Sequence, residues 1–213
     1  MVYSIKRKVE RMANEATPTS EAGVVKRRGN TRDRMVRTAA ELLGEYGVAG
    51  TSIDRVLSVS GAPRGSVYYH FPGGRAEMLS AAVEQAGELV LRTIGESPDP
   101  SAALRTFADF WRARLEVTGF RAGCPVLAVT VDENPDLPEL HGQAAAAFAG
   151  WQDALAARLV ESGLDDGAAA TLAEQSLCLL EGAVAMCRAR REIAPLDSAV
   201  EAIGALYRLR ERG

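Results

Sequence analysis

Residues 51–71 read TSIDRVLSVSGAPRGSVYYHF, and this stretch decides the fold of the N-terminal part of the chain. Thr51 or Ser52 is a suitable N-cap for a short helix with apolar residues at helical spacing, and Gly61 ends that helix in a turn. Pro63 suits the first turn of a second short helix that runs to about residue 70, because that turn needs no N–H from it. Two short helices joined by a glycine turn predict a helix-turn-helix, an arrangement that reads DNA.

The second helix of this motif presents two different faces on a helical wheel. Val67 and Phe71 share one face, which we expect to pack against the protein. The other face carries small or hydrogen-bonding side chains, which suit the major groove of DNA: Gly65, Ser66, Tyr69 and His70. The motif therefore has one side for the protein core and one side for a nucleic acid.

Three positions of this helix leave more than one interpretation open. Tyr68 flanks the packing face, so it is either a core aromatic with its hydroxyl at the edge or a DNA contact. Arg64 lies by helical angle beside the packing face, yet its long side chain can reach a base edge, and arginine pairs well with guanine. His70 either contacts a phosphate or caps the end of the helix.

The net charge of −3 conceals an uneven distribution along the chain. Residues 24–80 carry nine Lys or Arg and five Asp or Glu, whereas residues 81–213 carry twelve Arg and twenty acidic residues. A basic segment attracts a polyanion and an acidic segment repels it. The distribution predicts that DNA binds the part of the chain that contains the helix-turn-helix.

Helical periodicity on both sides of the motif divides the chain into three parts. Residues 1–30 show no apolar stripe and end in the basic run Lys26-Arg27-Arg28, so we expect a disordered arm that either contacts the phosphate backbone or is simply solvated. Residues 31–80 form the DNA-binding domain, whose first helix is capped by Thr31. A linking helix that starts at Arg75 joins it to a C-terminal domain at 81–213.

The C-terminal domain is predicted to consist of helices alone. Apolar residues recur at helical spacing near 101–118, 139–162, 168–191 and 195–211, and Gly123-Cys124-Pro125 opens a further short helix. No segment alternates with period two, so the fold class is all-α. The segment 168–191 is apolar over most of its circumference and must be covered on more than one side. We therefore expect a homodimer that forms through the helices at about 139–191.

These motifs also resemble a known family. Thr51-Ser52-Ile53, Val56, Ser60-Gly61, the run at 65–71 and Arg75 are similar to the N-terminal module of the tetracycline-repressor (TetR) family. The pieces FPGGR at 71–75 and GCPV at 123–126, followed by Ala-rich helices, resemble its LmrA/YxaF-like branch. Pro63 departs from the family pattern, which often has Ser or Thr at that position and therefore a hydrogen-bond donor.

The resemblance implies a homodimeric repressor that binds a palindromic operator in double-stranded DNA. It implies that a small-molecule effector enters a C-terminal ligand-binding and dimerisation domain and releases the DNA, with no cofactor. Implied phosphate contacts come from Thr51, Tyr69, His70 and Arg75, and implied base contacts come from Arg64, Gly65 and Ser66. Ser52 and Tyr68 complete the expected DNA-binding set. The sequence does not distinguish a repressor from an activator with the same DNA module.

Aromatic residues of the C-terminal domain suggest an effector pocket, because such pockets are mostly apolar. The residues expected to line it are Phe107, Phe110, Trp111, Phe120, Cys124, Phe148, Trp151 and Met186. Each aromatic residue is alternatively plain core. Cys124 lies at a predicted helix start, where the helix dipole would favour a reactive thiolate and hence a redox sensor. The alternative is an inert, packed cysteine.

Other functional classes have little support in the sequence. We do not predict an enzyme, because the C-terminal domain has one histidine, His141, and no nucleophile with a base can be singled out. The acidic cluster near Pro135 is interpreted as a solvated loop, and no metal is expected. No stretch is long and apolar enough for a membrane helix, and the N-terminus lacks the apolar segment of a signal peptide. These features predict a cytoplasmic protein.

Overall fold

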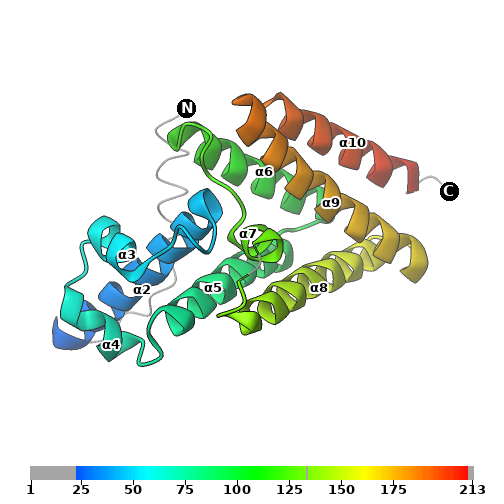
Figure 1. Ribbon diagram of the computed structural model, residues 1–213. Coiled ribbons are helices and arrows are strands. Elements are labelled where there is room, and N and C mark those ends of the chain that lie inside the picture. The colour runs from blue at the N-terminus through cyan, green and yellow to red at the C-terminus, as the bar shows by residue number, and fades with distance from the viewer. Residues whose placement is uncertain (1–22, 133, 211–213) are drawn as a thin grey trace.

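The structure, a computed structural model, describes residues 23–132 and 134–210 as a succession of helices (Figure 1). Their order is α2 (Gly23–Tyr46), α3 (Ile53–Ser60), the 3₁₀ turn η1 (Arg64–Ser66), α4 (Val67–His70), α5 (Gly74–Glu96), α6 (Pro100–Val117), α7 (Pro125–Val131), α8 (Pro138–Glu161), α9 (Asp166–Arg190) and α10 (Ala194–Arg210). The described residues contain no strand, which confirms the all-α fold class. None of these helices has the length and apolar character needed to cross a membrane.

The N-terminal module, formed by α2, α3, η1 and α4, is built around one apolar core. The fully buried side chains at its centre are Met35, Ala39, Leu43, Val56, Val67 and Phe71. Ser52 caps α3 by accepting a hydrogen bond from the Arg55 N–H at 3.2 Å. Gly61 ends α3 with a φ of 65°, a conformation that favours glycine. The expected packing face and turn are therefore confirmed.

Two boundaries differ from the sequence prediction. α2 begins at Gly23, so Thr31 lies inside the helix and is not its cap, since Lys26-Arg27-Arg28 favours helix and no proline interrupts it. The rest of the expected arm, at 1–22, lies outside the described residues. The single helix expected from Pro63 is instead the 3₁₀ turn η1 followed by α4, because the Ser66 N–H bonds to the Pro63 carbonyl, three residues back.

The body of the protein consists of the C-terminal part of α5 and the helices α6 to α10. α5 runs from the module into the body and packs along α8 (Figure 1). The buried Trp151 of α8 donates its indole N–H to the Gly87 carbonyl of α5 at 2.9 Å, so this pair is tied by a specific bond as well as by packing. α7 contacts α2, α5 and α8, and α10 packs against α9. α5 is therefore a continuous connection between the two parts.

Candidate DNA interface and its connection to the body

The exposed side of η1 and α4, residues 64–70, is the candidate DNA surface, here called the recognition edge. Val67 is buried, whereas Tyr68 and Tyr69 expose 68% and 61% of their surface. The interpretation of Tyr68 as a core aromatic is wrong, because most of its surface is exposed whereas Val67 and Phe71 are buried. Exposed tyrosines are among the side chains that contact phosphates and sugars in DNA complexes.

Three smaller contributions complete the recognition edge. Gly65 is exposed, and a Cβ there would meet no atom within 4 Å, so the packing of the protein does not require glycine at this position. Ser66 donates its hydroxyl to the Pro63 carbonyl at 2.6 Å and keeps its lone pairs as acceptors. His70 is half-buried, and its ring makes an edge contact with that of Tyr69 at 5.0 Å between centroids. The edge leaves space for another molecule to approach closely.

Arg64 lies at the start of the recognition edge and is held by an acidic residue of α3. Its guanidinium is 2.5 Å from the carboxylate of Asp54, and the two side chains are 81% and 74% exposed. An ion pair this exposed contributes about 0–1 kcal/mol. Arg64 is therefore oriented in the free protein but remains available to a base edge or a phosphate.

Thr51 does not belong to the surface that a phosphate can reach. It is fully buried, and its hydroxyl donates to the Gly47 carbonyl at 2.8 Å. The expected phosphate contact of its side chain is wrong for this conformation, because the side chain closes the turn between α2 and α3. Ser52, the next residue, is exposed and holds the helix cap.

Arg75, at the start of α5, has a positioning role in the free protein. Its guanidinium donates to the carbonyl oxygen of Thr51 at 2.9 Å and also to that of Val48. Arginine has five N–H donors, so the remaining ones can still bind an anion. Arg75 therefore fastens the linking helix to the turn before α3 and keeps a positive charge beside it.

Two side chains of the body hold the end of α2 and the turn that follows it. Arg188 of α9 donates to the carbonyl oxygens of Gly44 and Glu45, at 2.7 and 3.2 Å. Asp132, directly after α7, accepts from the Val48 N–H at 2.7 Å. A helix end leaves carbonyl groups unpaired and a turn leaves N–H groups unpaired, and the body satisfies both. The module is therefore attached to the body through its backbone.

At the same place two glycines bring backbones into contact. A Cβ on Gly44 of α2 would overlap the carbonyl oxygen of Gly123, and a Cβ on Gly123 would overlap the guanidinium of Arg188. No other residue fits at these positions without movement of the backbone. We call this region, made of Gly44, Gly123, Asp132 and Arg188, the junction.

The residues expected to line an effector pocket lie mostly in the core of the body. Trp111, Cys124 and Trp151 are buried, and the remaining aromatics are half-buried against the core: Phe107, Phe110, Phe120 and Phe148. Met186 exposes 42% of its surface, unlike the rest of the set, and its place in an effector pocket stays a prediction. An apolar cavity of about 40 Å³ between α5, α6, α8 and α9 is lined by Phe107 and by none of the others.

Cys124 is not the reactive thiol that its place at a helix start suggested. It is buried, and its sulfur accepts the Leu127 N–H at 3.5 Å as the N-cap of α7. Burial raises the pKa of the thiol well above its usual range, and the nearby carboxylate of Glu181 raises it further. Desolvation outweighs the helix dipole, so the thiol stays protonated and the redox-sensor interpretation loses its basis.

Glu181 of α9 is a buried acid that the sequence patterns did not single out. It is 8% exposed, and one of its carboxylate oxygens has no hydrogen-bond partner among the described residues. Burial raises its pKa to about 7, and the hydrogen bond with Cys124 opposes this rise. The same helix carries a second, exposed acid, Glu174, two turns earlier, so the sequence pattern does not single out Glu181. Arg188 of the junction follows about two helical turns later on the same face.

Asp54, Asp132 and Arg188 were also missed. Asp54 and Arg64 come from different helices, and no periodicity links them. Asp132 was placed in a solvated acidic loop, but its carboxylate binds backbone N–H groups of the module instead. Glu133 of the same cluster lies outside the described residues. Long-range bonds to backbone groups leave no trace in the spacing of residues along the chain.

Two sequence families match the chain over separate ranges. Residues 36–82 match the family described as bacterial regulatory proteins, tetR family. Residues 100–202 match the C-terminal domain of transcriptional regulators described as LmrA/YxaF-like. The first range contains the recognition edge, and the second contains α7, α8 and α9.

Individual relatives agree with these matches. An uncharacterized HTH-type transcriptional regulator of Mycobacterium tuberculosis is 42% identical over 78% of this chain and 88% of its own length. The HTH-type regulator LmrA of Bacillus subtilis is 24% identical over 79% of this chain and 92% of its own. A crystal structure of regulatory protein TetR from Rhodobacter sphaeroides shares the fold, with a TM-score of 0.70 at 24% identity over 83% of this chain and 98% of that one. The chain belongs to the TetR family of DNA-binding transcriptional regulators, in its LmrA/YxaF-like branch.

Proposed function

We propose that this regulator is a homodimeric repressor that binds a palindromic operator and releases it when a small-molecule effector binds the body. One observation carries the proposal: the module exposes its recognition edge on one side, while the junction attaches it to the body on another. Because the attachment uses backbone groups, a movement of the body carries the whole module with it. The body can therefore control where the recognition edge lies.

In the complex, the recognition edge enters the major groove. Arg64 and Ser66 contact base edges where Gly65 lets the two molecules approach, and Tyr69 and His70 bind phosphates on either side. Arg75 and Ser52 add contacts to the backbone of the DNA. Tyr68, fully available in the free protein, extends this surface.

A second copy of the chain covers the outer face of α9. This face exposes small residues at Cys178, Gly182 and Ala185, together with parts of Leu179 and Met186. Small residues allow helices to approach closely, and the apolar ones gain from being covered. A two-fold axis through this face gives the dimer two recognition edges for the two halves of a palindrome.

The effector acts by linkage between its own site and the DNA. It lowers DNA affinity only if it binds more tightly to the conformation in which the two recognition edges are wrongly spaced. α5 is the element that transmits the change, because its first turn bonds to the module through Arg75 and its last turns line the apolar cavity of the body.

The test begins with selection of a preferred DNA sequence from a random pool by the full-length protein. We expect Arg64→Ala and Tyr69→Ala to weaken binding of that sequence about 10-fold or more, the effect of losing one good contact. Arg92→Ala is the matched control, since Arg92 is also an exposed, ion-paired arginine but lies on α5. Circular dichroism and gel filtration confirm a folded dimer. Unchanged affinity in both edge variants would refute the assignment of the edge.

An activator with the same DNA module is the second candidate, because the sign of regulation depends on where the operator lies relative to a promoter. A reporter gene behind the selected sequence separates the two: a repressor lowers expression and an activator raises it. Since the target is chromosomal DNA, we place the protein in the bacterial cytoplasm.

A further inference from the structure

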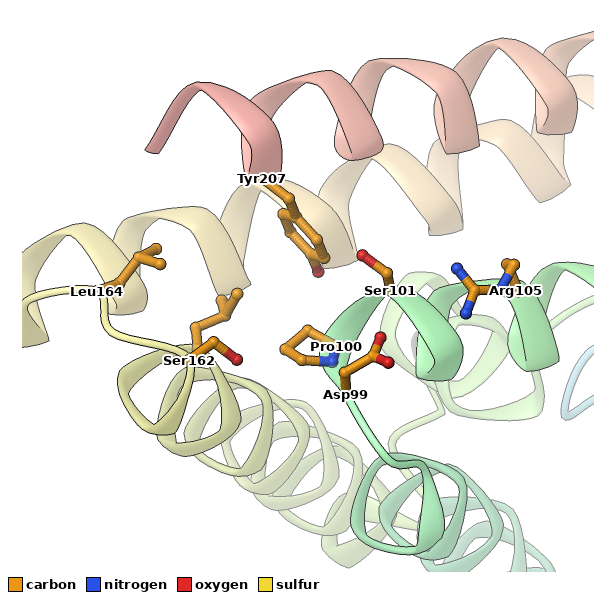
Figure 2. Close-up of a pocket in the computed structure, with 8 residues that line it drawn as sticks. Asp99, Pro100, Ser101, Arg105, Ser162, Leu164 and Tyr207 are labelled. Atoms are coloured by element: carbon orange, nitrogen blue, oxygen red, sulfur yellow. The ribbon is translucent and has the colours of Figure 1, made fainter. Parts of the chain in front are cut away.

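A cavity lies at the end of the body that is remote from the junction. It has a volume of about 300 Å³ and is formed where the start of α6, the α8–α9 loop and the end of α10 meet (Figure 2). Leu159 and Leu164 give it an apolar wall, and Ser101 and Arg105 give it a polar rim. This volume is at the lower end of the range for small-molecule sites.

The apolar cavity inside the body adjoins this outer cavity. Its volume is only about 40 Å³, and its lining includes Val90 and Ile94 of α5, Ala103 of α6 and Leu180 of α9. Pro100 and Tyr207 line both cavities, so these residues form the partition between them. The body therefore has two adjoining cavities, a polar one, here called the outer cavity, and an apolar one, here called the inner cavity.

Tyr207 lies where the two cavities adjoin. Its hydroxyl lies 3.4 Å from that of Ser176, and Ser176 donates its own proton to the Leu172 carbonyl at 2.7 Å. Tyr207 must therefore be the donor of the longer bond, which is weak at this distance. Figure 2 shows its ring reaching from α10 toward the first turn of α6. The ring of Tyr207 is buried in the core, so it separates the two cavities by packing as well as by this hydrogen bond.

The charges on the rim favour an anion. Asp99 uses its carboxylate to cap α6, accepting the Ala102 N–H at 2.7 Å, and the positive end of the helix dipole compensates its charge. Arg105 is exposed and makes no ion pair with the described residues, and its guanidinium turns toward Ser101 (Figure 2). Asp99 is therefore engaged by the helix, and Arg105 is the charged group of this cavity that is available to a ligand.

We propose that the two cavities form one binding site for a small amphipathic carboxylate, such as a medium-chain fatty acid anion. Arg105 and Ser101 bind the carboxylate. The apolar chain lies along Leu159 and Leu164 in the outer cavity, and only its end reaches the inner cavity beside Tyr207. The inference rests on the proposed function, since it identifies the chemical class of the effector. The inner cavity is lined by Val90 and Ile94, so the end of the chain would act on the helix that carries Arg75 at its other end.

The test is titration calorimetry of the full-length protein with octanoate, octan-1-ol and octylammonium, without DNA. We expect octanoate to bind most tightly and Arg105→Gln to weaken it about 10-fold, while the alcohol is little affected. Arg190→Gln is the matched control, because Arg190 is an exposed arginine at the other end of the body. Equal affinity for the three compounds, no binding at all, or no effect of Arg105→Gln would overturn the proposal.

Two further variants test the path of the apolar chain. Ala103→Leu fills the inner cavity and should weaken octanoate several-fold, whereas Tyr207→Phe removes the bond that closes the partition and should tighten it about twofold. Circular dichroism verifies that both are folded. If neither changes the affinity, the chain does not enter the inner cavity. Release of the selected DNA is measured separately, so octanoate that binds as expected without releasing DNA refutes the proposed regulation and not the site.

Discussion

The recognition edge is the free side of the small module and the junction is its attachment to the body, and the two regions use their polar groups in opposite ways. At the recognition edge Arg64 and Asp54 form an ion pair that is exposed on both sides. At the junction Arg188 and Asp132 bind backbone groups that have no partner within the module. The side chains of the recognition edge can therefore exchange their protein partners for DNA, whereas those of the junction stay bonded within the protein.

This difference has a functional meaning. A side chain in a weak exposed pair can change partners at little cost, which suits a surface that must bind and release DNA. A buried carbonyl or N–H that loses its partner costs about 1–3 kcal/mol, so the junction resists separation. The proposed regulation needs both properties, because it requires the body to move the module without losing it.

The largest effect is expected from a single methyl group at the junction. Gly44→Ala places a Cβ against the Gly123 carbonyl, so we expect the variant to be destabilised by about 3 kcal/mol, at the upper end for overpacking. Helix propensity alone predicts the opposite, a gain of about 1 kcal/mol for Ala in the interior of α2. Urea unfolding monitored by circular dichroism measures the difference.

Gly142→Ala is the matched control for this substitution. Gly142 also lies inside a helix, α8, but a Cβ there would meet no atom within 4 Å. This variant should be stabilised by up to about 1 kcal/mol. A stabilised Gly44→Ala protein would show that the two backbones are not in close contact, and the distinction between junction and edge would lose its main support.

The second effect concerns the buried carboxyl on the same face of α9 as Arg188. Burial raises the pKa of Glu181 from 4.5 to about 7, so between these values the folded protein holds a proton that the unfolded chain has released. Stability should therefore fall as pH rises through this window, by roughly 3 kcal/mol in total. Glu181→Gln cannot lose a proton, and its stability relative to the parent should rise by this amount between pH 5 and pH 8.

Urea unfolding of both proteins at several pH values measures this change. Glu174→Gln is the control, because Glu174 is an exposed acid on the same helix and its replacement leaves the core untouched. A stability difference between Glu181→Gln and the parent that does not depend on pH would mean that the carboxyl finds a proton donor or water in solution.

The fold was predictable because local patterns determine most of it. Each of these signals acts within a few residues of its own position: the apolar stripe on α2, the cap at Ser52, the left-handed turn at Gly61 and the prolines that begin α6, α7 and α8. The start of α2 was missed, because a charged segment with good helix formers has no apolar face that periodicity could detect.

The functional sites were predictable only in part. The exposed side of η1 and α4 was predicted correctly, because one side of a short helix must face the core and the other side is free, while its contacts with DNA stay a prediction. The junction was not found, since Asp132 and Arg188 bind backbone groups far away along the chain, and backbone groups have no sequence signature. Thr51 is the opposite case. The family resemblance implies that it contacts DNA, but here its hydroxyl closes a turn of the protein.

The smallest effect is expected at the recognition edge itself. Asp54→Asn removes the partner of Arg64 and a negative charge close to the DNA. The lost pair contributes less than about 1 kcal/mol to stability, so the variant should unfold almost like the parent. DNA affinity should rise by no more than about threefold, for the selected sequence and for unrelated DNA alike, because Arg64 no longer has to leave Asp54. Fluorescence anisotropy with labelled duplexes measures both affinities.

Glu88→Gln is the control for this variant, because Glu88 pairs with Arg92 in the same exposed manner on α5, away from the edge. Its DNA affinity should not change. If Asp54→Asn instead weakens binding of the selected sequence, Asp54 aligns Arg64 for the base it contacts, and the pair at the edge is a positioning device like those of the junction. Tyr69 would then still differ from the side chains of the junction, because it can change partners. Arg64 would not differ from them.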